Sequence, residues 1–447
     1  MKQNEEECKM KKIFGLLTIG ALGFALTSCT NANLNNEVSK ISVVDSDPID
    51  ENTRLTPLKN LPSKADISNI WSNNDYRSFI EKYNEFSYDL LEKIGDNTIE
   101  SNTAFSPLSI YMALSSIIPM LSDSAKQEVV DLFGMTSEEI YDNTKYLYSV
   151  SNNDYSLLSN SLWYRDDIDL NSKVIKEIAN VFYSEAYKVD FSKDLEKIYD
   201  YIKEKTNGLL DKCGDISPST VFYVLNTLYF NDEWSFDFNV NGFKTASFKN
   251  ADNSYVNKKL YYSNYDDYER MYETDDYSSY HIRSKNGYEF TYVKPNGDKK
   301  VKDIYNKEVI KDVVCHNYFT SDEKYNYYTR LAFPEYSAEY DKCINKVISD
   351  MGANEIFNYS LKPFSRITNE DISVGEIWHR TKLDITKEGF KASAATSIDI
   401  TLASTTSGVT KINKYETFYV DKSFFYVIQD NMGSILFSGV VNNVTND

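Results

Sequence analysis

A stretch of thirteen residues near the C-terminus alternates apolar and polar side chains without a break. Its apolar face carries Phe390, Ala392, Ala394, Thr396, Ile398, Ile400 and Leu402. A period of two predicts a strand with one face buried. The stretch nevertheless runs directly into residues 403–409, a small and polar sequence that is typical of an exposed loop. A segment with a core-strand pattern and a loop composition predicts two structural states.

The rest of the chain indicates one large globular domain. It has 447 residues, of which 41% are hydrophobic, and this is enough to bury a sizeable core. Residues 75–445 contain no Gly/Ser-rich or Pro-rich linker and no repeat of fixed period. The formal net charge is −19 and no basic stripe is present, which argues against a nucleic-acid partner.

The N-terminus has the features of an export signal. Met10-Lys11-Lys12 is followed by the apolar run Ile13–Leu26 and then by Thr27, Ser28 and Cys29. This order is typical of a secretory signal rather than of a membrane span. The Leu-Thr-Ser-Cys sequence resembles the bacterial lipobox, which predicts acylation of Cys29; the alternative is an ordinary signal with a chance cysteine. Glu5–Glu7 suits such a signal badly, so Met10 is a second candidate for the true start.

Three segments follow from these patterns. We expect residues 1–29 to be the lipoprotein signal peptide, 30–72 a flexible tether rich in Asn, Asp, Ser and Pro, and 73–447 the folded domain. Cys213, Cys315 and Cys343 form no CxxC pair and have no metal-ligand spacing. We therefore expect structural cysteines, no metal site and no cofactor.

The coarse secondary structure begins with helices and continues with strands. The sequence predicts a helix capped at Asn73-Asn74-Asp75 and ended by Gly95, a short strand at residues 103–105, and a helix opening at Leu108 after Pro107. Further predicted helices are 194–210 and 340–351. Further predicted strands are 221–230, 288–293, 329–333, 376–386, 418–427 and 435–441. This order favours the α+β class.

No motif for enzymatic chemistry is present. There are three histidines, and the sequence contains no Gly-x-Ser-x-Gly elbow, His-Glu-x-x-His motif, Walker loop or Gly-x-Gly-x-x-Gly loop. Runs such as Asp266-Asp267 and Asp275-Asp276 are typical of solvated faces. His379, beside Trp378 in a strand-like stretch, indicates a hydrogen-bonded core histidine. The sequence therefore predicts that this protein is not an enzyme.

Several motifs, in order, resemble those of the serpin family over roughly residues 75–445. The C-terminal ones are Ser373-Val374-x-x-Ile377-x-His379-Arg380-Thr381, the run from Lys387 to Thr396, Asp421-Lys422-Ser423-Phe424-Phe425, and Gly433 to Val440. The upstream ones are Asn102 to Ile110, Leu225 to Phe230 with Trp234 and Phe238, Met351-Gly352, and Phe364-Ser365. Each motif alone is weak, and their common order makes the resemblance specific.

This resemblance implies a serpin-like fold of about nine helices and three sheets with an exposed reactive loop. After cleavage by a target protease, the loop of a serpin inserts as a new strand into the main sheet. The implied function is suicide inhibition of serine or cysteine proteases by a secreted, lipid-anchored monomer on the bacterial cell envelope. The alternatives are a non-inhibitory serpin that acts as a surface binding or structural protein and, less favoured, a carbohydrate-handling lipoprotein enzyme.

The same resemblance assigns the residues that control insertion. The hinge is Glu388, Gly389, Phe390, Lys391, Ala392, Ser393, Ala394, Ala395 and Thr396. The shutter, where the sheet parts, is Ser106, Ser109, Asn226 and His379, and Trp234 marks the breach at the top of the sheet. Phe390, Ile398, Ile400 and Leu402 are expected to pass from water to core on insertion, which contributes on the order of 6–12 kcal/mol.

Two residues depart from the inhibitory pattern and favour the non-inhibitory alternative. Lys387 stands where inhibitory members usually have Glu, and Phe390 where they usually have Thr, Ser or Val. A benzyl group that must enter the sheet first is expected to slow insertion, because overpacking costs about 1–3 kcal/mol. On this reasoning, Phe390→Thr is expected to accelerate trapping.

The expected bait bond is Ala403–Ser404. In the family the cleaved bond lies fourteen residues beyond the hinge glycine, here Gly389, and the alternating pattern also stops after Leu402. Ala before the bond suits an elastase-like or subtilisin-like protease. Cleavage at Leu402–Ala403, by a chymotrypsin-like protease, is the alternative.

Overall fold

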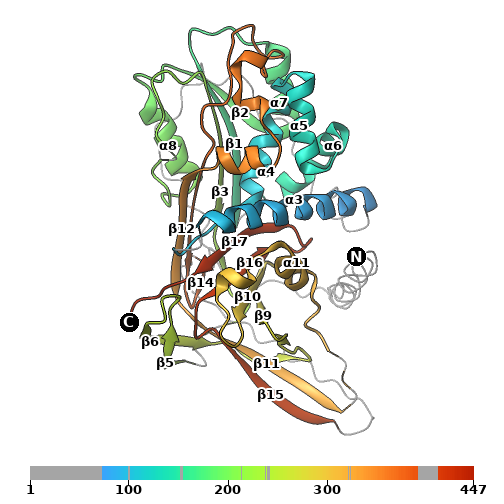
Figure 1. The fold of residues 1–447 in the computed structure, drawn as a ribbon, viewed down its shortest axis with the longest axis vertical. Coiled ribbons are helices and arrows are strands. Elements are labelled where there is room, and N and C mark those ends of the chain that lie inside the picture. Colours follow the sequence, from blue (N-terminus) through green and yellow to red (C-terminus); the bar gives the residue numbers. More distant parts are fainter. Residues whose placement is uncertain are drawn as a thin grey trace, which may run out of the picture.

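The computed structural model describes residues 73–98, 101–151, 155–212, 214–236, 238, 242–320, 322, 324–390 and 411–446. Nine α-helices and four hydrogen-bonded sheets are present in these residues, which confirms the predicted α+β class (Figure 1). The helices are α3 (Asn74–Thr98), α4 (Pro107–Ile117), α5 (Asp123–Phe133), α6 (Ser137–Val150), α7 (Ser172–Phe182), α8 (Leu195–Lys205), α10 (Val301–Ile304), α11 (Lys307–Cys315) and α12 (Asn345–Asp350).

The longer strands build the sheets. They are β1 (Ser156–Arg165), β2 (Ser184–Val189), β3 (Phe222–Phe230), β5 (Phe243–Lys249), β6 (Tyr255–Tyr262), β9 (Tyr277–Arg283), β10 (Glu289–Pro295), β11 (Tyr325–Pro334), β12 (Tyr336–Cys343), β13 (Trp378–Ile385), β15 (Ile412–Tyr419), β16 (Phe424–Gln429) and β17 (Ile435–Val441). Four two-residue strands complete them: β4 (Asp232–Glu233), β7 (Asp266–Asp267), β8 (Tyr272–Glu273) and β14 (Gly389–Phe390).

The sheets are arranged from the top to the bottom of the molecule. The upper sheet consists of two ladders, β2-β1-β3 and β12-β13-β14-β4, which are linked because β4 follows β3 after a single residue. The central sheet has the order β17-β16-β10-β9-β8, and the lower sheet has the order β15-β11-β6-β5. Helices α4 to α7 gather around the upper sheet, whereas β11 and β15 project at the lower end (Figure 1).

The core lies where the helices meet the central sheet. Every residue of β16 and β17 is buried, and the predicted strand 435–441 is confirmed at both ends. Gly439 of β17 has no room for a side chain, because a Cβ there would collide with the Thr103 carbonyl. Thr103 donates its backbone N–H to the Val440 carbonyl over 2.8 Å, so the short segment 103–105 pairs with β17 as a bridge rather than as a strand.

Two predicted helices differ from the structure. Helix α3 continues through Gly95 to Thr98; its buried side of Tyr and Phe rings packs on the core, and this tertiary contact outweighs the low helix propensity of one glycine. The predicted helix 340–351 is wrong in its first part, because Tyr340 lies in β12. The strand alternates buried and exposed side chains, and only Asn345–Asp350 is helical.

Other observed element boundaries differ from the predicted ones by a few residues. The predicted helix 194–210 is observed as α8, which ends at Lys205, and the predicted strand 418–427 is divided between β15 and β16. The predictions for the signal, Cys29, the tether and residues 391–410 lie outside the described residues. Within the described ranges, no helix combines the length and the apolar character that a membrane crossing needs.

Candidate functional site: the parted upper sheet and its hinge

The hinge begins as a tight turn at the end of β13. The Thr386 backbone N–H donates to the Gly389 carbonyl over 2.8 Å, and the Thr386 hydroxyl donates to the same carbonyl over 2.9 Å. The chain then reverses into β14, which runs antiparallel to both β13 and β4. Gly389 has a φ of +146°, and a Cβ there would overlap the Asp232 carbonyl. Only glycine fits this position, because the turn passes directly against β4.

Phe390 is already inserted in the upper sheet of the uncleaved chain. Its side chain is 1% exposed. It stacks on Phe230 with the ring centroids 4.8 Å apart and on Phe290 at 4.7 Å, and Trp234 meets it edge-on at 5.6 Å. Such aromatic pairs add stabilisation beyond the burial of their area. The expectation that Phe390 passes from water to core after cleavage is therefore wrong, because an aromatic cluster holds it in place beforehand.

Trp234 holds the hinge turn against the end of the upper sheet. Its indole Nε1–H donates to the Thr386 carbonyl over 2.8 Å, and its backbone N–H donates to the Glu388 carbonyl over 3.3 Å. The predicted breach residue therefore contacts both the turn and the first hinge residues. Lys387 donates its backbone N–H to Glu335 Oε1 over 3.0 Å and pairs with Glu388 at 3.5 Å, so the departure at this position is accommodated on the surface.

Among the described residues, the two ladders of the upper sheet meet only at β14, at the lower end of this sheet in Figure 1. In the part of the chain that the structure describes, β3 forms a ladder with β1 only, and β13 forms ladders with β12 and, at Ile385, with β14. No ladder joins β3 to β13 in these residues, although β4, the continuation of β3, pairs with β14. Two neighbouring ladders that are joined at one end only are the arrangement that accepts an added strand.

Three of the four shutter residues, Ser106, Ser109 and His379, are connected by hydrogen bonds. The Ser106 backbone N–H donates to His379 Nε2 over 3.1 Å, and the Ser106 hydroxyl caps α4 by accepting from the Ser109 N–H over 3.2 Å. Burial lowers the pKa of His379 to about 3, so the ring is neutral at neutral pH and can accept this bond. The expected core histidine at 379 therefore has the expected kind of partner.

Asn226 is on the other side of the parting. Its side-chain amide donates to Asn160 Oδ1 over 2.7 Å, toward β1, while its Oδ1 is buried without a hydrogen-bond partner among the described residues. The structure thus brings Ser106, Ser109 and His379 together and leaves Asn226 apart from them. An unsatisfied buried acceptor on an open strand edge is a group that an incoming N–H can satisfy.

Sequence reasoning missed the residues that receive the hinge. Phe230 and Phe290 lie in different strands, and nothing in their local patterns marks them as partners of Phe390. It also missed Arg380, whose guanidinium donates to Asp211 over 2.6 Å and to the Lys212 carbonyl over 2.8 Å. This contact ties β13 to the segment that follows α8. The alternation within β13 marks Arg380 as outward-facing, but it gives no partner.

Comparison with known proteins agrees with this geometry. The family model described as serpin (serine protease inhibitor) matches residues 81–444. An uncharacterized serpin-like protein of Methanosarcina acetivorans is 25% identical over 387 residues, covering 80% of this chain and 85% of the relative. The native structure of tengpin, a thermophilic serpin, superposes with a TM-score of 0.70 at 20% identity, covering 87% of this chain and 96% of tengpin. Thyroxine-binding globulin in complex with thyroxine gives a TM-score of 0.69 at 18% identity, covering 82% and 100%.

The two ladders of the upper sheet and the turn that leads into β14 thus agree with the motifs that resemble a serpin. The chain belongs to the serpin family, whose members are generally protease inhibitors.

Proposed function

We propose that this protein is a secreted, lipid-anchored inhibitor of serine proteases that works by loop cleavage and strand insertion. One observation carries the proposal: β14 already pairs with β13 and with β4, the continuation of β3, while no other ladder joins β3 to β13 among the described residues. The chain that continues from Phe390 is the alternating stretch, with Ala392 and Ala394 first on its inward face. Small side chains there keep the steric cost of further insertion low.

In the proposed mechanism the target protease supplies the nucleophile. Its serine attacks the Ala403 carbonyl, the Ala403–Ser404 bond breaks, and an acyl-enzyme links the protease to Ala403. The freed segment then adds as a strand between β3 and β13 and carries the protease with it. Insertion competes with hydrolysis of the acyl-enzyme. A hinge that is already inserted as far as Phe390 before cleavage therefore favours trapping.

Trapping is tested by mixing the protein with pancreatic elastase and with subtilisin, followed by denaturing gels. We expect a stable adduct near the summed mass of the two proteins. Ala394→Arg should instead give cleaved protein and free protease, because the inserted strand would carry an unpaired charge on its inward face. If the wild type is cleaved cleanly by every serine protease tried, and no adduct forms, the inhibitory function is refuted.

The position of the bait bond is a separate expectation. Mass spectrometry of the C-terminal peptide released from the adduct should show an N-terminus at Ser404, or at Ala403 for a chymotrypsin-like protease. An adduct whose released peptide begins at Ile412, after cleavage by a trypsin-like protease at Lys411, would overturn the assignment.

A non-inhibitory binding function is the second candidate. Thyroxine-binding globulin shows that this fold also occurs in a complex with a small ligand. Lys387, which stands where inhibitory members of the family usually have Glu, is the observation that favours this candidate. Clean cleavage without adducts, combined with no change in thermal stability on cleavage, is the result that would support it.

The lipid anchor at Cys29 is also a proposal, supported by the Leu-Thr-Ser-Cys sequence. In a bacterial host, the wild-type protein should partition into the detergent phase, and Cys29→Ala should move to the aqueous phase, because two or three acyl chains dominate membrane binding. Ser28→Ala, which leaves the thiol in place, is the matched control. Identical partitioning of wild type and Cys29→Ala would exclude the anchor.

A further inference from the structure

Strands β11 and β15 form a ribbon that projects from the lower end of the molecule (Figure 1). They pair in parallel from Tyr325↔Ile412 to Ala332↔Tyr419. Strand β6 covers only the last residues of β11, from Ala332 to Pro334. β15 is the edge strand, and its outer side carries no ladder in the described residues. The ribbon therefore offers a long strand edge as well as two sheet faces.

One face of this ribbon carries a connected set of aromatic rings, which we call the tyrosine face: Tyr262, Tyr265, Tyr328, Tyr415 and Tyr419. Tyr328 and Tyr415 are stacked with centroids 4.9 Å apart, and Tyr415 meets Tyr265 edge-on at 5.2 Å. The Arg330 guanidinium lies between the rings of Tyr262, at 4.5 Å, and Tyr265, at 4.7 Å. Tyr419 contacts the far side of Tyr262 at 6.2 Å.

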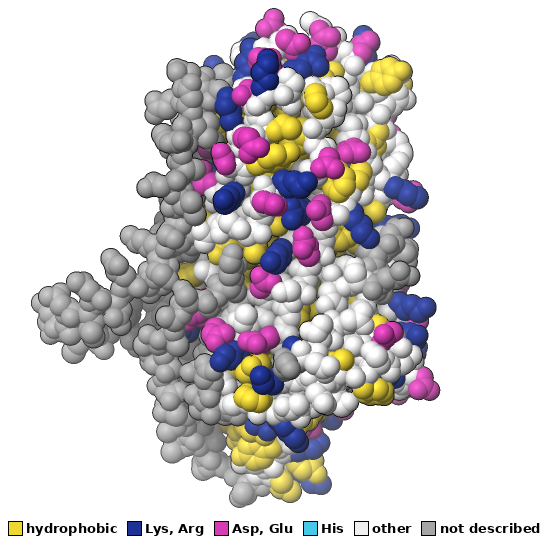
Figure 2. Space-filling model, turned by 90° about the vertical axis from the view of Figure 1, so that its left-hand side faces the viewer, with side chains coloured by type: hydrophobic (Ala, Val, Ile, Leu, Met, Phe, Trp, Pro, Cys, Tyr) yellow, Lys and Arg dark blue, Asp and Glu magenta, His cyan; other side chains and the backbone are white. Residues whose placement is uncertain are grey.

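The tyrosine face is open to solvent. Tyr415 is 60% exposed, and Tyr265 and Tyr419 are each more than a third exposed. Figure 2 shows hydrophobic side chains interleaved with Lys and Arg at this lower end of the molecule. Exposed rings that share one face mark an interaction surface, and Tyr and Arg are the side chains that most often dominate protein–protein binding energy.

The two faces of the ribbon hold different cations. Arg330 lies among the rings of the tyrosine face. Lys414 and Arg270 lie over Tyr327, and Lys324 lies over Tyr325, on the opposite face of β11. The tyrosine face is therefore mainly aromatic, with one guanidinium held between its rings.

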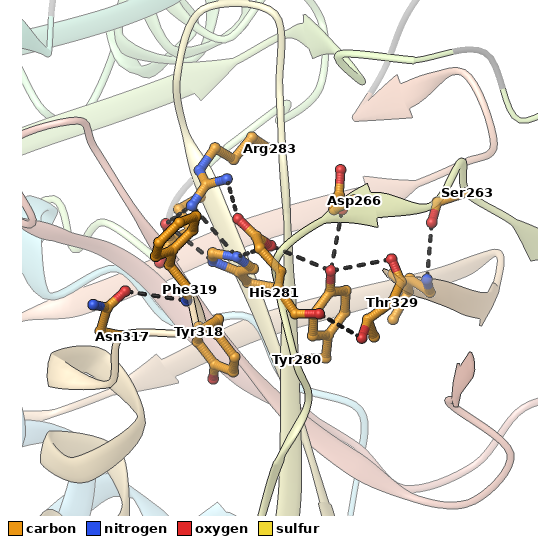
Figure 3. Close-up of polar contacts among 12 residues, drawn as sticks. Ser263, Asp266, Tyr280, His281, Arg283, Asn317, Tyr318, Phe319 and Thr329 are labelled. Carbon is orange, nitrogen blue, oxygen red and sulfur yellow. Dashed lines mark hydrogen bonds and ion pairs between the residues drawn. The ribbon is translucent and has the colours of Figure 1, made fainter. Parts of the chain in front are cut away.

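A buried ionic cluster fixes the segment that carries Tyr265 (Figure 3). The Tyr280 hydroxyl lies 3.2 Å from Asp266 Oδ2, 3.2 Å from Glu269 Oε2 and 3.3 Å from the Thr329 carbonyl of β11. Glu269 is also held by His281 at 2.8 Å. The segment 263–270, β11 and the central sheet are thereby joined beneath the tyrosine face.

His281 and Arg283 pair with the two glutamates of this cluster, whereas burial and the neighbouring Glu269 raise the pKa of Asp266 to about 6. The His281 ring lies between Glu269 and Glu289, 3.1 Å from the latter, and Arg283 reaches both carboxylates. Burial opposes the charged imidazole, but the two glutamates outweigh it and raise the pKa of His281 to about 9. An ionised and paired cluster holds the surface in one conformation, which reduces the entropy lost on docking.

The position of the tyrosine face relative to the bait bond identifies the partner. Ala403 precedes Lys411 by eight residues, and eight extended residues span at most about 29 Å. A protease domain of ordinary size has a radius of gyration near 17 Å. A protease engaged at Ala403–Ser404 therefore remains within reach of the ribbon on which the bait segment ends.

We propose that the tyrosine face is a docking surface for the target protease, outside the bait segment itself. This inference rests on the proposed inhibitory function and adds to it a determinant of specificity. The surface selects a protease by aromatic contacts made outside the protease active site. It acts on the encounter before cleavage, and it is not needed for strand insertion.

The test measures the second-order rate constant for adduct formation with the protease that the wild type inhibits fastest in a panel including elastase and subtilisin. The double variant Tyr265→Ser/Tyr415→Ser should lower this rate constant by roughly tenfold, as truncation of aromatic hot spots does. Tyr255→Ser is the matched control, because Tyr255 is 66% exposed on β6 of the same sheet but outside the tyrosine face. The number of inhibitor molecules consumed per protease should stay unchanged.

The outcomes separate the two proposals. Adducts that form at equal rates with wild type, the double variant and Tyr255→Ser would overturn the docking surface and leave the inhibitory function intact. A rise in inhibitor consumed per protease, with the rate constant unchanged, would also overturn it, since the rings would then act on insertion. No adduct with any protease would remove the inhibitory function and this inference with it.

Discussion

Cleavage between Ala403 and Val409 is expected to raise the melting temperature of the protein. Ile398, Ile400 and Leu402 share the apolar face of the bait stretch, and their burial on insertion contributes about 5–9 kcal/mol. Ladder hydrogen bonds from the inserted strand to β3 and β13 add to this. For a domain of this size the entropy of unfolding is roughly 0.8 kcal/mol per kelvin. The expected increase is therefore on the order of 10 °C, measured by calorimetry before and after nicking with elastase.

A matched variant separates insertion from simple loss of a loop. Ile400→Ser should leave the melting temperature of the intact protein unchanged and reduce the gain on cleavage, because the side chain is buried only after insertion. The insertion mechanism is excluded if cleaved wild type melts at or below the temperature of the intact protein.

The architecture was largely predictable because its patterns are local. Strand 435–441 is mostly apolar and every residue of it is buried, and Ser106 followed by Pro107 has the chemistry of a helix start, so both appear where expected. The helix predicted at 340–351 failed because a short alternating strand adjoins a short helix. Over so few residues the two periods overlap.

The receiving half of the site was not predictable in the same way. The hinge sequence was evident, and so were His379 and Ser106, since each belongs to a short motif. The contacts of Phe390 with Phe230 and Phe290 join segments a hundred or more residues apart in the chain, and no spacing rule encodes them. For the same reason Phe390 was interpreted as an obstacle to insertion, when its ring already occupies the sheet.

That correction reverses the expected effect of mutating the hinge. Phe390→Ala removes a ring stacked between Phe230 and Phe290, and Phe-to-Ala changes in cores cost about 3–5 kcal/mol. The melting temperature of the intact protein should fall by about 4–6 °C. Trapping should become less efficient, because the first inserted residue is no longer held in place before cleavage, and more inhibitor should be consumed per protease. Calorimetry and titration of protease activity measure the two effects.

Two comparisons make this expectation specific to the inserted ring. Phe243→Ala is the control, since Phe243 is 53% exposed on β5 and exposed substitutions change stability by about 0.5 kcal/mol or less. Because Phe390 is buried before cleavage and belongs to the inserted strand afterwards, Phe390→Ala should lower the melting temperatures of both forms and leave the gain on cleavage intact, unlike Ile400→Ser. Faster trapping by Phe390→Thr or Phe390→Ala than by wild type would show instead that the ring obstructs insertion. The stacked hinge would then lower the rate at which the protein traps a protease.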